Sequence, residues 1–208
     1  MNTANGFFKW NDKKTQQVAG MTLPDAWWSR GYEYAWALQY AEPSHIVADM
    51  GTGWMYRPFR DALAEVCGYV YGVDIDNRLL HQKRADNVEF VIASITEPIQ
   101  HIPANSLDRI FCISVLEDMG DMIGSAVKEF ARLLYPDGRM ILTFDVQYDM
   151  DKPLAQYPGV NLKKFLQALD DNNLVIDGEL ELDKTDAVYN KDFNLCCLHM
   201  VVKHGSTS

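Results

Sequence analysis

The chain has 208 residues, of which 48% are hydrophobic, and a formal net charge of −10 at pH 7. This size suits one domain with a sizeable core, and the acidic balance argues against a general basic surface for nucleic acid or anionic lipid. No apolar run approaches the roughly 20 residues that span a bilayer, and residues 1–10 lack the pattern of a secretory signal. We therefore expect a cytoplasmic protein that does not bind membranes.

The N-terminal part of the chain divides at a proline. Residues 1–24 are mixed and polar and end in that proline, so we interpret them as an N-terminal arm. The main domain is predicted over residues 25–204 and a flexible tail over residues 205–208. Asp25 resembles a helix N-cap, and the segment after it predicts a helix over residues 26–41.

Apolar runs then alternate with helical patterns along the rest of the chain. We predict strands at residues 46–49, 69–74, 88–93, 107–114, 139–144, 174–180 and 193–202. We predict helices at residues 58–66, 77–83, 121–134 and 162–169. Such alternation is typical of a parallel sheet covered on both faces, and the last two strands, with no helix between them, form a hairpin. The expected fold class is α/β: a Rossmann-like three-layer αβα sandwich with a seven-stranded, mostly parallel sheet and an antiparallel last strand.

The cysteine pattern argues against a metal site. The four cysteines form no C-x-x-C pair and have no histidines at zinc spacing: Cys67, Cys112, Cys196 and Cys197. We therefore expect buried, reduced thiols and no bound metal.

Two predicted strands end in carboxylates with the spacing of a nucleoside-binding unit. The first ends at Asp49 and runs into Gly51 and Gly53, and the second ends at Asp74. The glycines let the backbone pass close to a ligand. A carboxylate at the end of the second strand can accept hydrogen bonds from both ribose hydroxyls. This layout predicts a nucleoside site.

Further residues beyond the strand ends belong to the same predicted site, because ligands of open α/β sheets bind at the carboxyl edge. They are Thr52, Ile75, Ser94, Ile95 and Ser114.

The glycine loop departs from the dinucleotide pattern. G-x-G-x-x-G requires a third glycine, but Tyr56 stands three residues after Gly53. Asp49 would also bring a negative charge toward the loop, which repels a pyrophosphate and attracts the sulfonium and ammonium groups of S-adenosylmethionine. We therefore expect a cationic nucleoside ligand and disfavour a nicotinamide-dependent oxidoreductase.

These motifs resemble those of class I S-adenosylmethionine-dependent methyltransferases over roughly residues 27–203. The matching segments, in order, are residues 47–53, 73–76, 90–95, 106–110, 114–118 and 130–139. Three positions depart from the family pattern. Met55 stands where a third glycine is usual, Ser94 where aspartate is frequent, and Asp137 where a glycine is common.

The resemblance implies methyl transfer from S-adenosylmethionine to a small-molecule acceptor, with S-adenosylhomocysteine as the product. The displacement is in line, so positioning supplies most of the catalysis, and a base is needed only if the nucleophile must lose a proton. Candidates for a base, by location, are Glu117, Asp118, Asp145 and Tyr148. The alternative is a non-catalytic protein of the same fold that binds the cofactor or its product.

The predicted helix over residues 26–41 allows two interpretations of its side chains. Aromatic residues recur at every fourth position: Trp28, Tyr32, Trp36 and Tyr40. We interpret this stripe as core packing, with a substrate cage as the alternative. The resemblance implies that the aromatic residues from Trp27 to Tyr40, together with Tyr148 or Tyr157, are candidates to line the substrate. Arg30 either pairs with a surface carboxylate such as Glu33 or binds the cofactor carboxylate as a charged fork.

Overall fold

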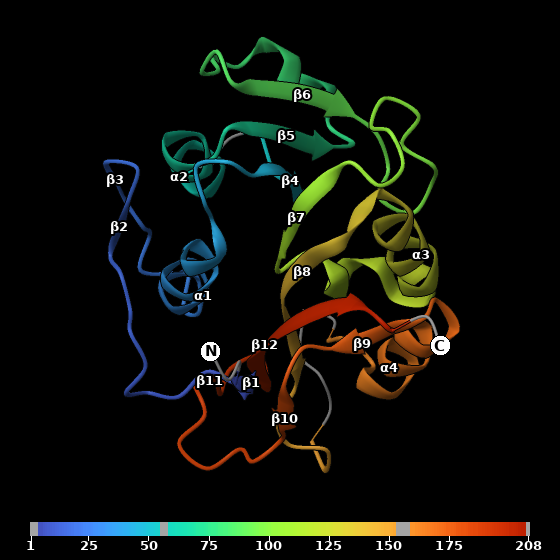
Figure 1. Ribbon diagram of the computed structural model, residues 1–208. Coiled ribbons are helices and arrows are strands. Elements are labelled where there is room, and N and C mark those ends of the chain that lie inside the picture. Colours follow the sequence, from blue (N-terminus) through green and yellow to red (C-terminus); the bar gives the residue numbers. More distant parts are fainter. Residues whose placement is uncertain (1–3, 55–57, 153–158, 207–208) are drawn as a thin grey trace.

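A ten-stranded sheet forms the centre of the protein in a computed structural model that describes residues 4–54, 58–152 and 159–206 (Figure 1). Its strands are β1 (Ala4–Phe7), β4 (Ile46–Met50), β5 (Tyr69–Asp74), β6 (Val88–Ile92), β7 (Leu107–Ile113), β8 (Leu134–Gln147), β9 (Leu174–Ile176), β10 (Glu179–Glu181), β11 (Tyr189–Asn190) and β12 (Leu195–His204). A separate hairpin joins β2 (Gln17–Val18) and β3 (Met21–Thr22).

The strand order confirms the expected α/β class. Strands β6, β5, β4, β7 and β8 are neighbours in that order and run parallel, and β12 is antiparallel to β8. The expected count of seven strands was wrong, because the segment 174–180 splits into β9 and β10 around Gly178, which has φ +112°. Strands β1 and β11 are the other two additions.

Helices cover both faces of the sheet (Figure 1). The helices are α1 (Arg30–Ala37), α2 (Pro58–Val66), α3 (Ile123–Leu133) and α4 (Leu162–Asp171), with 3₁₀ turns at Leu38–Tyr40, Asn77–His81 and Leu116–Met122. Residues of α1 and α2 pack in one apolar cluster and residues of α3 and α4 in another. Within β7, Ile110 belongs to the second cluster and Phe111 to the first, as the period of a strand requires. The sheet and the helices on its two faces therefore form three layers.

Several element boundaries differ from the prediction. The helix expected over residues 26–41 begins only at Arg30, since the capping residue is Ser29 rather than Asp25. The helix expected over residues 121–134 starts as a 3₁₀ turn and ends at Leu133, where β8 begins directly. Regular pairing of β8 with β7 nevertheless begins at Arg139, the predicted start, because the register is broken around Pro136, between the Leu107–Leu134 and Arg109–Arg139 pairs.

The beginning of the chain contributes to the sheet. Strand β1 lies within residues 1–24, expected to be an arm, and pairs with β12 and β10. Asn5, 1% exposed, donates its amide to the carbonyls of Asp177 and Glu179, at 3.2 and 3.1 Å, and its Oδ1 accepts from Val201 N at 2.7 Å. These long-range contacts place β1 in the domain, while the other expected domain limits stay predictions.

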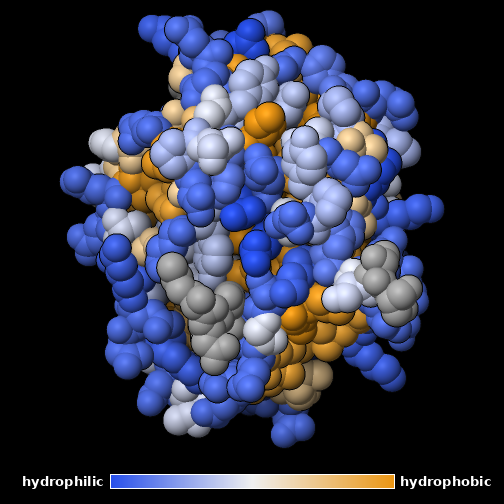
Figure 2. Space-filling view, viewed as in Figure 1, coloured by the Kyte–Doolittle hydropathy of each residue, from blue (hydrophilic) through white to orange (hydrophobic). Residues whose placement is uncertain are grey.

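The surface seen in Figure 2 is predominantly hydrophilic, in keeping with the net charge of −10. No helix of the described residues has the length and apolar character that crossing a membrane requires. The four cysteines are all buried and free.

Candidate functional site

The carboxyl ends of β4 and β5 form a cradle around the Asp74 carboxylate. The N–H groups of Gly51 and Thr52 donate to the carbonyl of Val73, at 2.8 and 3.0 Å. Gly53 N donates to Asp74 Oδ2 at 2.8 Å, and Asp76 N donates to Asp74 Oδ1 at 2.9 Å. Each carboxylate oxygen keeps further accepting capacity. Asp74 is therefore held in one orientation and can still accept hydrogen bonds from a ligand.

Both glycines of the loop adopt backbone conformations that favour glycine, and Gly51 is also closely packed. Gly51 has φ +77° and Gly53 has φ +71°, in the left-handed region. A Cβ on Gly51 would lie 2.5 Å from Val115 Cγ2, in the loop after β7. The loops after β4 and β7 consequently touch, which brings Ser114 to the same edge as Asp74.

Asp49 lies beneath the loop, 5% exposed. Burial raises its pKa to about 6, against the opposing charge of Arg60. Arg60 is fully buried in α2, donates from Nε and Nη2 to Asp61 Oδ1, and lies over the Phe90 ring at 4.8 Å. Asp49 is therefore buried near the end of β4 rather than exposed at the open edge.

The residues after β5 and β6 have separate environments. Ile75 is 74% exposed beside Asp74, and Ile95 is buried in the core. The Ser94 hydroxyl lies 2.8 Å from Thr96 Oγ1 and accepts from Thr96 N at 3.2 Å. The hydroxyl of Ser94 thus stabilises the turn that contains Ser94 and Thr96. Met55, Tyr56 and Tyr157, which also entered the sequence argument, lie outside the described residues.

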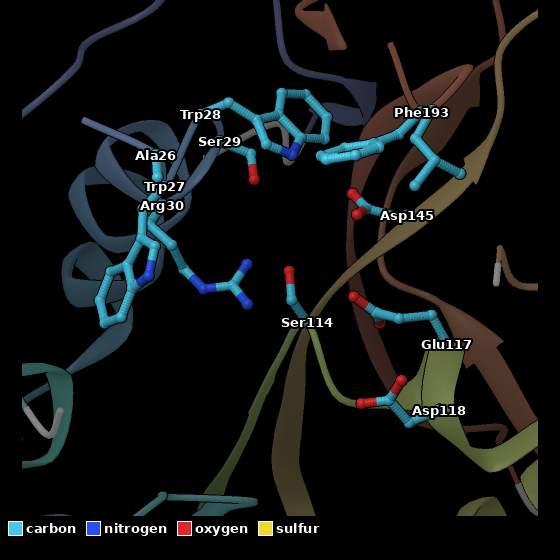
Figure 3. A pocket seen from close by; sticks show the side chains of 11 residues that line it. Ala26, Trp27, Trp28, Ser29, Arg30, Ser114, Glu117, Asp118, Asp145 and Phe193 are labelled. Atoms are coloured by element: carbon cyan, nitrogen blue, oxygen red, sulfur yellow. The ribbon is translucent and has the colours of Figure 1, made fainter. Parts of the chain in front are cut away.

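A cavity of about 490 Å³ continues the edge past Ser114 (Figure 3). One wall is the segment 26–30 before and at the start of α1, and the other carries Glu117, Asp118 and Asp145. Phe193, just before β12, completes the upper side. The cavity thus has an aromatic and basic wall facing an acidic one.

Arg30 points into this cavity (Figure 3) and forms an ion pair with Glu33. Arg30 Nη1 lies 2.8 Å from Glu33 Oε1, and Ser114 Oγ donates to Glu33 Oε2 at 2.7 Å. Thr143 Oγ1 also donates to Glu33 Oε2. Burial opposes the charge of Glu33, but Arg30 and the hydroxyl donors lower its pKa. The expected ion pair between Arg30 and Glu33 is present. We had expected Glu33 to lie on the surface, but it is fully buried.

Glu117 and Asp145 are the carboxyls of the cavity that each have a buried oxygen without a hydrogen-bond partner in the described part of the chain. Glu117 Oε2 and Asp145 Oδ1 are buried and have no hydrogen-bond partner among the described residues. Burial raises the pKa of Asp145 to about 7. Burial and the charge of Asp145 raise the pKa of Glu117 well above its usual range. The pair consequently keeps a proton near neutral pH unless a cation replaces it.

The remaining predicted residues divide between the cavity and the core. Tyr148 stacks on Tyr189, with ring centroids 4.5 Å apart, and does not line the cavity. Within the aromatic stripe, Trp28 lines the cavity, whereas Trp36 packs on Phe8 and His199. The stripe is therefore largely core packing. Trp27, which the resemblance implied as a lining candidate, also lines the cavity, whereas sequence reasoning missed Phe193, because only the tertiary fold brings it there.

Comparisons with known proteins agree with this architecture. Residues 48–142 match the family model described as "Methyltransferase domain". A search of curated protein sequences gives no match.

Three solved structures share the fold at low identity. The [4+2]-cyclase SpnF is 12% identical, with coverage of 97% of this chain and 87% of its own and a TM-score of 0.68. Geranyl diphosphate C-methyltransferase from Streptomyces coelicolor A3(2), solved with S-adenosyl-L-homocysteine, is 13% identical, with coverage of 84% and 79% and a TM-score of 0.62. A TehB-like SAM-dependent methyltransferase from Corynebacterium glutamicum is 19% identical, with coverage of 83% and 88% and a TM-score of 0.59.

Proposed function

Because residues 48–142 match the model of a methyltransferase domain, we propose that the protein is a class I S-adenosylmethionine-dependent methyltransferase that methylates a small-molecule acceptor in the cavity beside Arg30. The observation that carries the proposal is the Asp74 carboxylate, oriented by two backbone N–H groups at the glycine loop with accepting capacity to spare. The cavity adjoins this loop through Ser114, so cofactor and acceptor would meet there.

The residues at this edge fit the cofactor. Asp74 would accept from the ribose hydroxyls, and exposed Ile75 beside it would cover the flat base. Arg30, whose guanidinium faces the cavity, would bind the cofactor's carboxylate. S-adenosylmethionine supplies an activated methyl group when bound.

The protein's own contribution is positioning. A cavity of about 490 Å³ suits a small molecule. Glu33 ties α1 to β8 through Thr143 and to the loop after β7 through Ser114, so the two walls are held at a set separation. Holding reactants in line supplies about 7–11 kcal/mol in favourable cases. Asp145 and Glu117 can take up a proton where the acceptor must lose one.

A protein that binds the cofactor without methyl transfer is the second candidate. It is favoured by Ser94, which stands where the family frequently has aspartate and whose hydroxyl contacts Thr96, and by the likeness to SpnF, a cyclase of the same fold. Release of labelled methyl groups onto an acceptor panel separates the two candidates, because only an enzyme incorporates label.

The test of the cofactor site is calorimetry with S-adenosylhomocysteine. Asp74→Ala should weaken binding by about 1.5–3 kcal/mol, the range for hydrogen bonds to a charged group. Asp86→Asn, an exposed carboxylate before β6, serves as the control and should leave affinity unchanged. No binding to the unaltered protein would refute both candidates, and unchanged affinity in Asp74→Ala would remove Asp74 from the site.

A further inference from the structure

We propose that the cavity between α1 and β8 takes a protonated amine, held by Glu117 and Asp145 against an aromatic wall, and that this amine nitrogen is the methyl acceptor. The methyl-transfer part rests on the proposed function, whereas the binding part stands on the cavity itself.

Two carboxylate oxygens of the cavity lack a hydrogen-bond donor within the part of the chain that the structure describes. Glu117 Oε2 and Asp145 Oδ1 are buried and lack a donor among the described residues. Figure 3 shows both carboxylates directed toward the cavity. A buried charged oxygen without a donor is costly, so such atoms indicate where a ligand donates. An ammonium group carries three donors and the compensating charge.

The cavity walls carry more negative than positive charge. Arg30 is the cation of the cavity lining within the described residues, and Glu33, with two hydroxyl donors, already pairs with it. Glu117 and Asp145 form no ion pair of their own among the described residues and share the charge of Arg30 with Glu33, and exposed Asp118 adds to the negative potential. A neutral alcohol would satisfy hydrogen bonds but leave this charge uncompensated.

Aromatic side chains also line the cavity. Half-buried Trp28 lies beside Phe193 at the upper side, and half-buried Trp27 lies on the wall opposite the carboxyls, beyond the Arg30 guanidinium (Figure 3). Aromatic faces attract organic cations and bury an apolar body. A metal ion is a poorer fit, because the described residues contain no group of three or more His, Cys, Asp or Glu side chains arranged to hold one.

The chemistry balances with the groups present. The carboxylate pair takes a proton from R–NH3⁺, which frees the nitrogen lone pair. The nitrogen forms a bond to the methyl carbon as the carbon–sulfur bond breaks, and the bonding electrons stay on sulfur as S-adenosylhomocysteine. The products are R–NH2–CH3⁺ and a carboxyl proton that returns to solvent.

The experiment compares matched probes by calorimetry in the presence and absence of S-adenosylhomocysteine. The probes are 2-phenylethylamine, 2-phenylethanol and 3-phenylpropionate, together with shorter and longer homologues of each. At a pH of about 8 the amines should bind at least about tenfold more tightly than the alcohols, and the acids should bind least. Asp145→Asn and Glu117→Gln should each reduce this preference to about twofold or less.

Two controls keep the outcomes separate. Asp86→Asn makes the same change of charge on an exposed loop and should keep the preference. Affinity for S-adenosylhomocysteine should not change in Asp145→Asn or Glu117→Gln. A loss there would mean that the pair holds the cofactor's own ammonium group, which overturns the proposal. An absent preference for amines across the series also overturns it. If the protein binds amines but not S-adenosylhomocysteine, the proposed function fails and the amine site stands.

Discussion

At the scale of single residues, the burial of Asp145 lowers the stability of the fold while it prepares the side chain for ligand binding. Its pKa is raised to about 7 in the fold, against about 3.9 in an unfolded chain. The folded state therefore binds more protons between these values, so stability falls as pH rises through this window and stays lower above it. The same burial that weakens the fold prepares the carboxylate to receive a cation.

Asp145→Asn removes this conflict. The gain in free energy of unfolding over the unaltered protein should be small at a pH of about 4 and reach about 1–3 kcal/mol at a pH of about 8. Urea denaturation across this range measures it, with Asp86→Asn as the exposed control. A difference that does not vary with pH would contradict the raised pKa of Asp145.

Gly51 shows a second residue-scale constraint. Gly51→Ala forces a Cβ to within 2.5 Å of Val115 at φ +77°, which should cost about 1–3 kcal/mol and weaken S-adenosylhomocysteine binding. Gly124→Ala is the matched control, because its Cβ meets nothing within 4 Å in α3, and it should stabilise by up to about 1 kcal/mol. Thermal unfolding of both variants measures this difference. A loss of stability in Gly51→Ala alone indicates strain at Gly51, and an equal loss in both variants indicates a general effect of alanine.

At the scale of elements, Asn5 joins three strands. Its side chain connects β1 to the segment leading into β10 and to β12 through three hydrogen bonds. Asn5→Ala leaves buried groups unsatisfied and should cost about 2–4 kcal/mol in chemical denaturation. Asn172→Ala, which removes one bond to Ala168 O at a helix end, should cost about 1 kcal/mol or less. Equal losses of stability in Asn5→Ala and Asn172→Ala would mean that β1 contributes little to the stability of the sheet.

The elements also show where sequence patterns suffice. The strand ending in Asp74 and the helix Pro58–Val66 follow the predicted bounds, because apolar periodicity and an N-terminal proline are local signals. Strand β1 was missed because four residues beside polar neighbours carry no periodicity. It is held by partners some 175 or more positions away in the chain, such as Asn5 with Leu180 and Gly6 with His199.

At the scale of the whole molecule, the net charge of −10 favours cationic ligands. The dissociation constant of 2-phenylethylamine should rise by about two- to fivefold between about 20 mM and 300 mM NaCl, because salt screens this attraction. The dissociation constant of 2-phenylethanol should stay constant over the same titration. If salt changed both dissociation constants equally, the change would reflect an effect of salt on the protein fold rather than screening of the amine's charge.

The sequence by itself determined the α/β class, the glycine loop and the carboxylate at the end of β5, because these depend on residues close together in the chain. Only the tertiary structure decided that Glu33 is buried under Arg30, that Ser114 and Thr143 hold it, and that Glu117 and Asp145 share one cavity. Burial and pairing depend on segments brought together across α1, β7 and β8. A carboxylate's charge, and hence its chemistry, is set by those neighbours rather than by its place in the chain.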